Sequence, residues 1–356
     1  MVASMSDSNL NTRQAAILAN MFLGRAYGAE EIMSFFGANS PAPATLRRDL
    51  KQLEILGYIE QHGEKRGTTY RKTVPGALFS PIEPREYFRK ETDARNGLNA
   101  YQHDVWKSVP KTFFGEQELE SFGVATQKYL ARSNTVSDVL RKKELERFVI
   151  ELSWKSSKIE GNTYTLLDTE RLIRDGVEAP GHTKDEAVMI LNHKKAFNYI
   201  LEAKRSRSFA DKRFIEDVHA ILVEGLGVSR GFRRGVVGIT GSVYRPLDIP
   251  TQLEEATQEL CAAVTTQTDA YSQALLMLVG ISYVQPFEDG NKRTARLVAN
   301  ALLIAGEKAP LSYRSVDETL YRESMLTFYE QLSIMPMKNI FADQYIFACE
   351  QYLKGE

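Results

Sequence analysis

One stretch, residues 284–296, constrains this chain more than any other. An almost uncharged run at 274–284 precedes it and is long enough for about three helical turns of ~3.6 residues. Pro286 must disturb this helix, because proline lacks a backbone donor and clashes with the preceding turn. Beyond Gly290 a second helical pattern begins, with apolar residues at 295, 298, 299 and 302. The stretch predicts two helices joined by a tight turn that ends at a helix N-terminus.

The turn carries the groups that a phosphate site needs. Free backbone N–H groups and the positive end of the helix dipole attract anions. Arg293 and Arg296 are three residues apart, so both guanidinium groups project from one face of the second helix. Asp289 precedes the turn, where a carboxylate could hold a divalent cation between phosphate oxygens. A solvated turn with two surface arginines is the alternative for a lone Asp-Gly-Asn, but the longer pattern is more specific. The residues expected at the phosphates are Gly290, Asn291, Lys292, Arg293 and Arg296.

The stretch resembles the signature of the Fic (Fido) family, His-Pro-Phe-x-(Asp/Glu)-Gly-Asn-(Gly/Lys)-Arg-x-x-Arg. The resemblance implies a mainly α fold, a Fic/Fido helical bundle with a β-hairpin flap. It also implies binding of ATP with Mg²⁺, held in part by Asp289, and transfer of AMP to a protein hydroxyl. The resemblance covers residues 145–305 firmly and the flanks loosely. Its matching positions are Pro286, Phe287, Asp289, Gly290, Asn291, Arg293 and Arg296.

The match fails at the first position, where the histidine of the family is Gln285. In the family that histidine takes the proton from the target hydroxyl. A glutamine amide donates and accepts hydrogen bonds but takes no proton at neutral pH. Loss of a general base typically costs ~10²–10⁴ in rate. Lys292 is also found in the Doc-like branch, which transfers the γ-phosphate of ATP. Three functions therefore stay open: an impaired protein adenylyltransferase, a non-catalytic nucleotide-responsive regulator of transcription, and a Doc-like phosphotransferase.

A helical pattern from 140 to 160 ends at Gly161-Asn162, a pair that favours a left-handed helix cap. Ser156 and Glu160 are four residues apart and share a face of this helix. The segment resembles the inhibitory motif (Ser/Thr)-x-x-x-Glu-(Gly/Asn) of Fic proteins whose inhibitory helix is N-terminal to the core. The resemblance implies that Glu160 pairs with Arg296 at the γ-phosphate position. A carboxylate on an arginine fork competes directly with phosphate.

A stretch rich in glycine and β-branched residues, 231–244, alternates in polarity and predicts a β-hairpin. The resemblance places the flap here, a strand edge that would pair with a segment of the target protein. Main-chain hydrogen bonds would let such an edge accept many target sequences. A purely structural hairpin is the alternative. The expected flap residues are Val236, Val237, Ile239 and Thr240.

Residues 8–73 have a separate pattern, with helices expected at 14–23, 29–36 and 46–56 and a hairpin at 58–71. This pattern resembles a winged helix-turn-helix, in which the third helix enters the major groove of double-stranded DNA. Dimerisation or protein contacts are the alternative, because fold does not fix function. Three prolines predict a linker at 74–100, and the Fic domain with its flanking helices is expected at 101–356. The expected DNA-binding residues are Arg47, Arg48, Lys51, Lys65 and Arg66.

Composition sets wider limits. The 356 residues fit one domain of ~200–250 residues and a smaller one. The net charge is −1, so any DNA contact requires a local basic patch. No apolar run reaches ~18 residues, and Met1 to Asn11 lacks the features of a signal peptide. Two cysteines fit a reducing, cytoplasmic setting. His193 and His219 lie in apolar helical contexts and are expected to be structural. The sequence does not define the oligomeric state, and a homodimer is one possibility.

Overall fold

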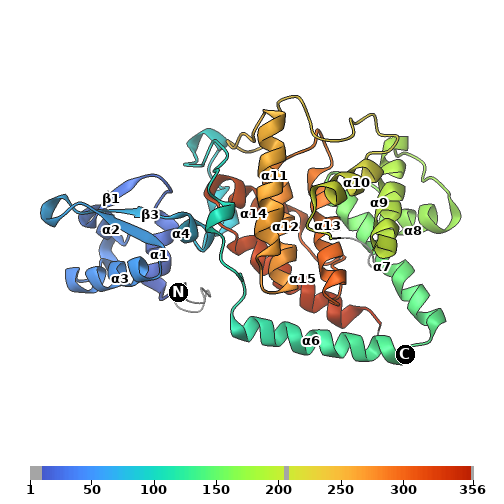
Figure 1. Cartoon of the computed structure of the whole chain (residues 1–356), viewed down its shortest axis with the longest axis horizontal. Coiled ribbons are helices and arrows are strands. Elements are labelled where there is room, and N and C mark those ends of the chain that lie inside the picture. Colours follow the sequence, from blue (N-terminus) through green and yellow to red (C-terminus); the bar gives the residue numbers. More distant parts are fainter. Residues whose placement is uncertain (1–9, 204–207, 354–356) are drawn as a thin grey trace. The chain divides into compact units, whose positions relative to one another are not determined.

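The computed structural model describes residues 10–203 and 208–353, except for the side chain of Arg66. The expectations for the first nine residues and for Arg66 as a DNA contact therefore lie outside the described residues. The fold is mainly helical with one small sheet, as predicted (Figure 1). It divides into two compact units. The first unit comprises Met1–Gly115, Gly238–Arg245 and Glu323–Lys338, and the second comprises Glu116–Val237, Pro246–Arg322 and Asn339–Glu356.

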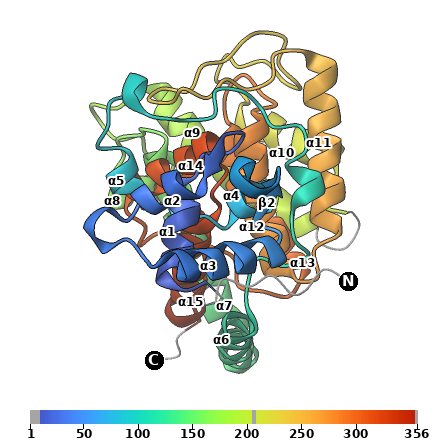
Figure 2. The same cartoon turned by 90° about the vertical axis from the view of Figure 1, so that its left-hand side faces the viewer.

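The first unit begins with three helices and a three-stranded antiparallel sheet of order β1–β3–β2 (Figures 1 and 2). Its register pairs Ala26 with Arg71 and Ile59 with Lys72. The predicted hairpin is present as β2 and β3. Strand β1 was not predicted, because three residues are too few for an alternating pattern to stand out. The elements are α1 (Thr12–Asn20), β1 (Ala26–Gly28), α2 (Ala29–Ser34), α3 (Pro43–Ile55), β2 (Ile59–His62) and β3 (Thr69–Lys72).

A buried carboxylate joins α1 to α3. Asp49 is 2% exposed and accepts hydrogen bonds from Arg13 Nε at 2.7 Å and Asn11 Nδ2 at 3.1 Å. Burial opposes ionisation of Asp49, but the hydrogen bonds from Arg13 and Asn11 and the Arg13 charge lower its pKa. Around this pair the apolar faces of the helices form a core that includes Ile17, Leu18, Ile32, Leu50 and Leu53. The N-terminal helices therefore form a packed body with its own core.

The segment 74–100, expected to be a linker, is folded within the first unit. It contains α4 (Val74–Leu78) and α5 (Pro84–Tyr87). The backbone of α4 approaches Tyr58 so closely that a Cβ on Gly76 would lie 2.0 Å from the Tyr58 carbonyl oxygen. Further along, Arg95 Nε donates to Glu330 Oε2 at 3.1 Å, and both side chains are buried. Such buried contacts are incompatible with a flexible connection.

The second unit is an all-helical bundle built around the two helices of the sequence motif. Every residue from Ala274 to Val284 is buried, which explains why this run carries no charge. Helices α12 and α13 lie side by side, and α7, α9 and α10 pack on α13 (Figure 1). Helices α14 and α15 each contribute residues to both units. The helices are α6 (Glu116–Thr135), α7 (Asp138–Ile159), α8 (Leu166–Asp175), α9 (Lys184–Ala203), α10 (Lys212–Leu222), α11 (Pro250–Thr265), α12 (Ala270–Val284), α13 (Asn291–Ala305), α14 (Glu318–Gln331) and α15 (Met335–Gln351).

The prediction of a β-hairpin at residues 231–244 is wrong. This stretch forms bends and turns without strand pairing, and the only bridge nearby in the described chain joins Ala100 to Arg245. Gly231 and Gly241 both adopt a φ of +78°, which interrupts an extended path. The side chain of Arg233 also donates to the carbonyl oxygens of Gly235 and Leu247. A side chain therefore satisfies acceptors that a partner strand would satisfy in a hairpin.

Two further sequence expectations concern membranes and cysteines. Within the described chain, no helix combines the length and apolarity needed to cross a membrane. Cys261 and Cys349 are both buried and form no disulfide.

Candidate functional site

The turn between α12 and α13 has the architecture that the sequence predicts. Helix α12 ends at Val284 and is capped by Gln285, whose backbone is left-handed at φ 52° and whose N–H donates to the Ile281 carbonyl at 3.0 Å. Gly290 caps α13 at φ +80°, a conformation that costs an L-residue roughly 1–2 kcal/mol. A left-handed glutamine is uncommon, so the surrounding contacts must hold Gln285 in place.

Those contacts come from a closed amide network. Gln285 Nε2 donates to the Ser282 carbonyl at 2.6 Å, and Gln285 Oε1 accepts from Asn291 Nδ2 at 2.9 Å. Asn291 also donates to the Phe287 carbonyl at 2.8 Å and accepts from the Phe287 N–H at 2.9 Å. Gln285 is 8% exposed. Its amide thus stabilises the turn from within, with both polar ends engaged by the protein.

Arg293 and Asp289 form the cationic and anionic parts of the turn. Arg293 Nη2 donates to Asp289 Oδ2 at 2.8 Å. The Asp289 side chain is 64% exposed, whereas that of Arg293 is 2% exposed. Among the described residues, buried Arg293 Nη1 has no hydrogen-bond partner. Burial lowers the pKa of Arg293, and the nearby carboxylates of Asp289 and Glu160 oppose that shift. A buried donor without a partner beside a helix N-terminus fits a bound anion.

His219, on α10, packs against the α12–α13 turn. Its ring stacks on that of Phe287, with centroids 3.7 Å apart and planes 4° from parallel. His219 Nε2 donates to the Asp289 carbonyl oxygen at 3.0 Å. Burial lowers the pKa of His219 to about 4, despite the hydrogen bond to Asp289, so the ring is neutral at pH 7. The position of His219 fits the structural role expected from the sequence.

Helix α7 ends where Gly161-Asn162 predicts a cap. The Asn162 N–H donates to the Ser157 carbonyl at 3.1 Å, and the Gly161 N–H donates to that of Lys158 at 3.0 Å. Gly161 has a φ of +99°. These two bonds and the left-handed glycine form a Schellman motif. The motif fixes Glu160 as the last residue before the chain turns away from the helix.

Glu160 contacts two cations of α13. Its Oε1 accepts from Arg296 Nη2 at 2.9 Å, the pairing that the family resemblance implies, and its Oε2 accepts from Lys292 Nζ at 2.8 Å. We call Glu160, Lys292 and Arg296 the Glu160 cluster. The Glu160 side chain is 16% exposed. Burial opposes its ionisation, but the charges and hydrogen bonds of Arg296 and Lys292 lower the pKa of Glu160 to about 2. The carboxylate is charged throughout the neutral range.

Arg296 is also fixed by Ser156, one turn before Glu160. Arg296 Nε donates to Ser156 Oγ and Nη2 donates to the Ser156 carbonyl, both at 2.8 Å. His193 Nε2 lies 2.8 Å from Ser156 Oγ. Arg296 is fully buried, and its guanidinium carbon lies 5.5 Å from the centroid of the Tyr321 ring. Helices α7, α9 and α13 therefore meet at Ser156 through side-chain hydrogen bonds.

Arg233 was not singled out in the sequence. It is 3% exposed, and its Nε donates to the Gln285 carbonyl at 2.8 Å. Its backbone N–H donates to the Pro286 carbonyl at 2.9 Å, and its two terminal nitrogens hold Gly235 and Leu247. Arg233 therefore ties the irregular segment to the α12–α13 turn. No sequence signal distinguishes it from exposed Arg234.

The other predicted residues lie outside the α12–α13 turn and the Glu160 cluster. On the expected flap, Val236 is 80% exposed and Val237 is half-buried, while Ile239 and Thr240 belong to the first unit. In the first unit, α3 exposes its basic side chains on the face opposite buried Leu46 and Leu50. The exposed basic residues are Arg47, Arg48 and Lys51 on α3 and Lys65 between β2 and β3.

The site has limited means to hold a metal by protein ligands alone. The described residues contain no group of three or more His, Cys, Asp and Glu side chains placed to bind a metal ion. Mg²⁺ ordinarily keeps several waters and binds through one or two carboxylates together with substrate phosphates. Exposed Asp289 fits such a shared arrangement.

The chain is similar to known proteins in sequence and in fold. Residues 209–303 match the family model described as "Fic/DOC family". The chain is 24% identical over 217 residues to a "Protein adenylyltransferase Fic" of Drosophila mojavensis, a match that covers 60% of this chain and 43% of that protein. It thus spans less than half the length of the curated relatives that it matches first.

Two solved structures share the fold. A Fic domain containing signaling protein from Bacteroides thetaiotaomicron superposes with a TM-score of 0.54 at 20% identity, covering 64% of this chain and 93% of that chain. A Fic family protein from Desulfovibrio desulfuricans gives 0.55 at 19% identity, covering 68% and 76%. At these identities the likeness concerns the fold alone.

Proposed function

We propose that the region around residues 209–303, which matches the Fic/DOC family model, is a Fic domain that binds ATP with Mg²⁺. We further propose that it is an autoinhibited, catalytically impaired protein adenylyltransferase. The observation that carries the proposal is the Glu160 cluster. The Glu160 carboxylate forms ion pairs with two cations, Lys292 and Arg296, at the helix end where a phosphate would bind. A phosphate group can replace the carboxylate on the same donors, so the two compete.

The proposed nucleotide site uses the α12–α13 turn. Gly290 and Asn291 present the helix N-terminus, and buried Arg293 supplies Nη1, a donor without a partner among the described residues. Lys292 and Arg296 would receive the terminal phosphates once Glu160 withdraws. Asp289, exposed beside Arg293, would hold Mg²⁺ together with phosphate oxygens. The metal would supply charge neutralisation at the phosphates.

Gln285 is the reason to propose impairment. Its amide has no proton-accepting site at neutral pH, and both of its polar ends bond to the protein. The target hydroxyl would therefore have to lose its proton without a general base, at a cost of ~10²–10⁴ in rate. On this proposal the protein would bind nucleotide without efficient catalytic turnover.

A regulator without turnover is the second candidate function. Support comes from the first unit, whose α3 exposes Arg47, Arg48 and Lys51 beside a two-stranded hairpin that carries Lys65. We propose that residues 8–73 are a winged helix-turn-helix and that these cations contact double-stranded DNA. Nucleotide binding in the Fic domain would then modulate DNA binding.

The deciding experiment uses ATP radiolabelled at the α-phosphate, Mg²⁺ and candidate target proteins. The protein is compared with Glu160→Gly, Gln285→His and the double variant. We expect label on protein only in variants that contain Gln285→His, and most in the double variant. Label with Glu160→Gly alone would refute the impairment that we assign to Gln285.

Two further measurements separate the alternatives. A parallel reaction with ATP labelled at the γ-phosphate detects a Doc-like phosphotransferase. Calorimetric titration of ATP into the unaltered protein and Glu160→Gly tests binding itself. Absence of ATP binding in Glu160→Gly would refute the nucleotide site, whatever the labelling result. A change in affinity for duplex DNA on adding ATP would favour the regulator.

A further inference from the structure

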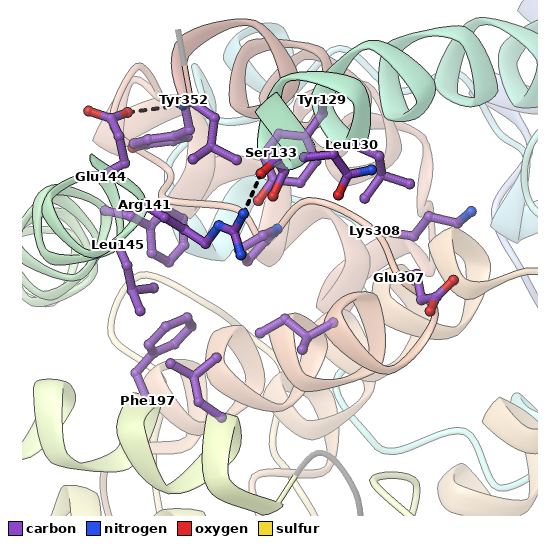
Figure 3. Close-up of a pocket in the computed structure, with 16 residues that line it drawn as sticks. Tyr129, Leu130, Ser133, Arg141, Glu144, Leu145, Phe197, Glu307, Lys308 and Tyr352 are labelled. Atoms are coloured by element: carbon purple, nitrogen blue, oxygen red, sulfur yellow. Dashed lines mark hydrogen bonds between the residues drawn. The ribbon is translucent and has the colours of Figure 1, made fainter. Parts of the chain in front are cut away.

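A cavity lies in the second unit, lined by residues other than those of the α12–α13 turn. Its volume is about 480 Å³, within the ~300–1,000 Å³ that is usual for small-molecule sites. It is lined by side chains from α6, α7, α9, the end of α13 and the chain after α15 (Figure 3). Its walls are largely apolar and include Leu145, Phe148, Phe197 and Ile304. The lining belongs to none of the residues assigned to nucleotide, metal or DNA.

The lining contains two cations, Arg141 and Lys308, and Lys308 Nζ lies over the Tyr271 ring, 5.4 Å from its centroid. The guanidinium of Arg141 points into the cavity in Figure 3, and its Nη2 donates to the Ser133 carbonyl at 2.7 Å. Its nearest carboxylate in the described chain, Asp138, is 3.8 Å from Nη1 and 90% exposed. An exposed ion pair of that length contributes little and leaves Arg141 available to a ligand.

The acidic residues of the lining do not neutralise Arg141. Glu144 Oε2 accepts from Arg147 Nη2 at 2.8 Å and from the Leu353 N–H at 3.0 Å. The carboxylates of Glu144 and Glu307 point away from the Arg141 guanidinium (Figure 3). An apolar body with one acidic group complements this arrangement, because the body fills the cavity while the acid binds the guanidinium bidentately.

We propose that this cavity binds an amphipathic organic acid, a ligand with an apolar aliphatic or aromatic body and a single acidic group. The cavity shares three helices with the Ser156–Arg296 contacts, namely α7, α9 and α13. Occupancy would thus stabilise helices that position Glu160. The proposal does not rest on catalysis or on nucleotide binding.

The test uses two fluorescent probes that differ in one charged group: anilinonaphthalene sulfonate and the uncharged N-phenylnaphthylamine. The full chain is expected to bind both saturably, one molecule per chain. Leu145→Trp, which fills the cavity at a position already 41% exposed, should abolish binding of both probes. Arg141→Gln should weaken the sulfonate by about tenfold or more, the worth of one charge-assisted bond, and leave the uncharged probe unchanged. Leu167→Trp, at a 70% exposed position of α8, is the matched control and should bind both probes normally.

Competition identifies the ligand body. Displacement of the sulfonate probe by dodecanoate supports an aliphatic acid, and displacement by indole acetate supports an aromatic acid. Failure of both acids to displace the probe would overturn the proposal. So would unchanged probe binding in Leu145→Trp, or equal weakening of both probes by Arg141→Gln. Circular dichroism of each variant establishes that the fold is intact.

Discussion

Replacing Glu160 with glutamine keeps the size of the side chain and removes the charge shared by Lys292 and Arg296. Lowering the pKa of a carboxyl from 4.5 to about 2 corresponds to about 3 kcal/mol of interaction in favour of its charged form. A phosphate that displaces this carboxylate must overcome that interaction. Glu160→Gln removes most of it, so we expect ATP to bind ~10–100-fold more tightly in the variant.

The same substitution should destabilise the nucleotide-free protein. Fully buried Arg296 would lose its carboxylate partner, and uncompensated buried charges typically cost ~3–5 kcal/mol. Because Ser156 still accepts two bonds from Arg296 and Lys292 is partly exposed, we expect a loss near ~3 kcal/mol. Saturating ATP should recover much of this loss, since its phosphates bind the folded state.

Calorimetric titration with ATP and AMP measures the first effect, and urea denaturation measures the second. AMP lacks the terminal phosphates that would reach Lys292 and Arg296, so its affinity should change little. Glu170→Gln is the matched control, because Glu170 pairs with Arg174 on the surface of α8. Equal gains for ATP and AMP, or no gain for ATP in a folded variant, would refute the assignment of Glu160 to the phosphate position.

Three more predictions concern other parts of the molecule. Arg233→Gln should lower the free energy of unfolding by ~3 kcal/mol, because the buried Gln285 carbonyl and the carbonyls of Gly235 and Leu247 lose their donor. Exposed Arg234→Gln should change it by less than ~0.5 kcal/mol in the same urea denaturation. The pKa of His219 is lowered from 6.5 to about 4. The contribution of the neutral ring to the free energy of unfolding is therefore complete above pH 6.5 and is lost as the pH falls toward 4. The free energy of unfolding from urea denaturation should fall by up to ~3 kcal/mol over that pH interval, and by less in His219→Gln. An equal fall in both proteins would contradict this. Finally, Arg47→Ala with Arg48→Ala should weaken binding to duplex DNA and reduce the salt dependence by about one unit per lost phosphate contact; unchanged binding would argue against α3 as the contact.

Much of the site was predictable from local chemistry. Pro286 and Gly290 fix the end of one helix and the start of the next, and the structure has this arrangement. Gly161-Asn162 likewise places the end of α7. The pairing of Glu160 with Arg296, which lie 136 positions apart, followed only from the family resemblance. Local spacing carries no information on such long-range contacts, and Lys292 as a second partner of Glu160 was therefore missed.

The wrong predictions share a physical cause. Prolines predicted a linker at 74–100, but Pro75 and Pro84 lie in the first turns of α4 and α5, where the missing N–H has no helical partner in any case. Alternation predicted a hairpin at 231–244, but Arg233 binds carbonyls there in place of a strand. In both segments the local pattern was compatible with two structures, and distant partners selected one.

The presence of Glu160 and Gln285 in the same chain does not by itself indicate turnover. An inhibitory residue is useful only where there is an activity to inhibit, which favours an enzyme. Yet Arg296 is fully buried, and removing the carboxylate partner of a buried guanidinium is costly whether or not the protein catalyses a reaction. Glu160 supplies that charge to both Arg296 and Lys292. The Glu160 cluster is therefore expected in an active enzyme and in a nucleotide-binding regulator alike, and Gln285 is the residue that distinguishes them. Restoring the histidine at that one position, with the cluster left intact, separates loss of the base from inhibition by Glu160.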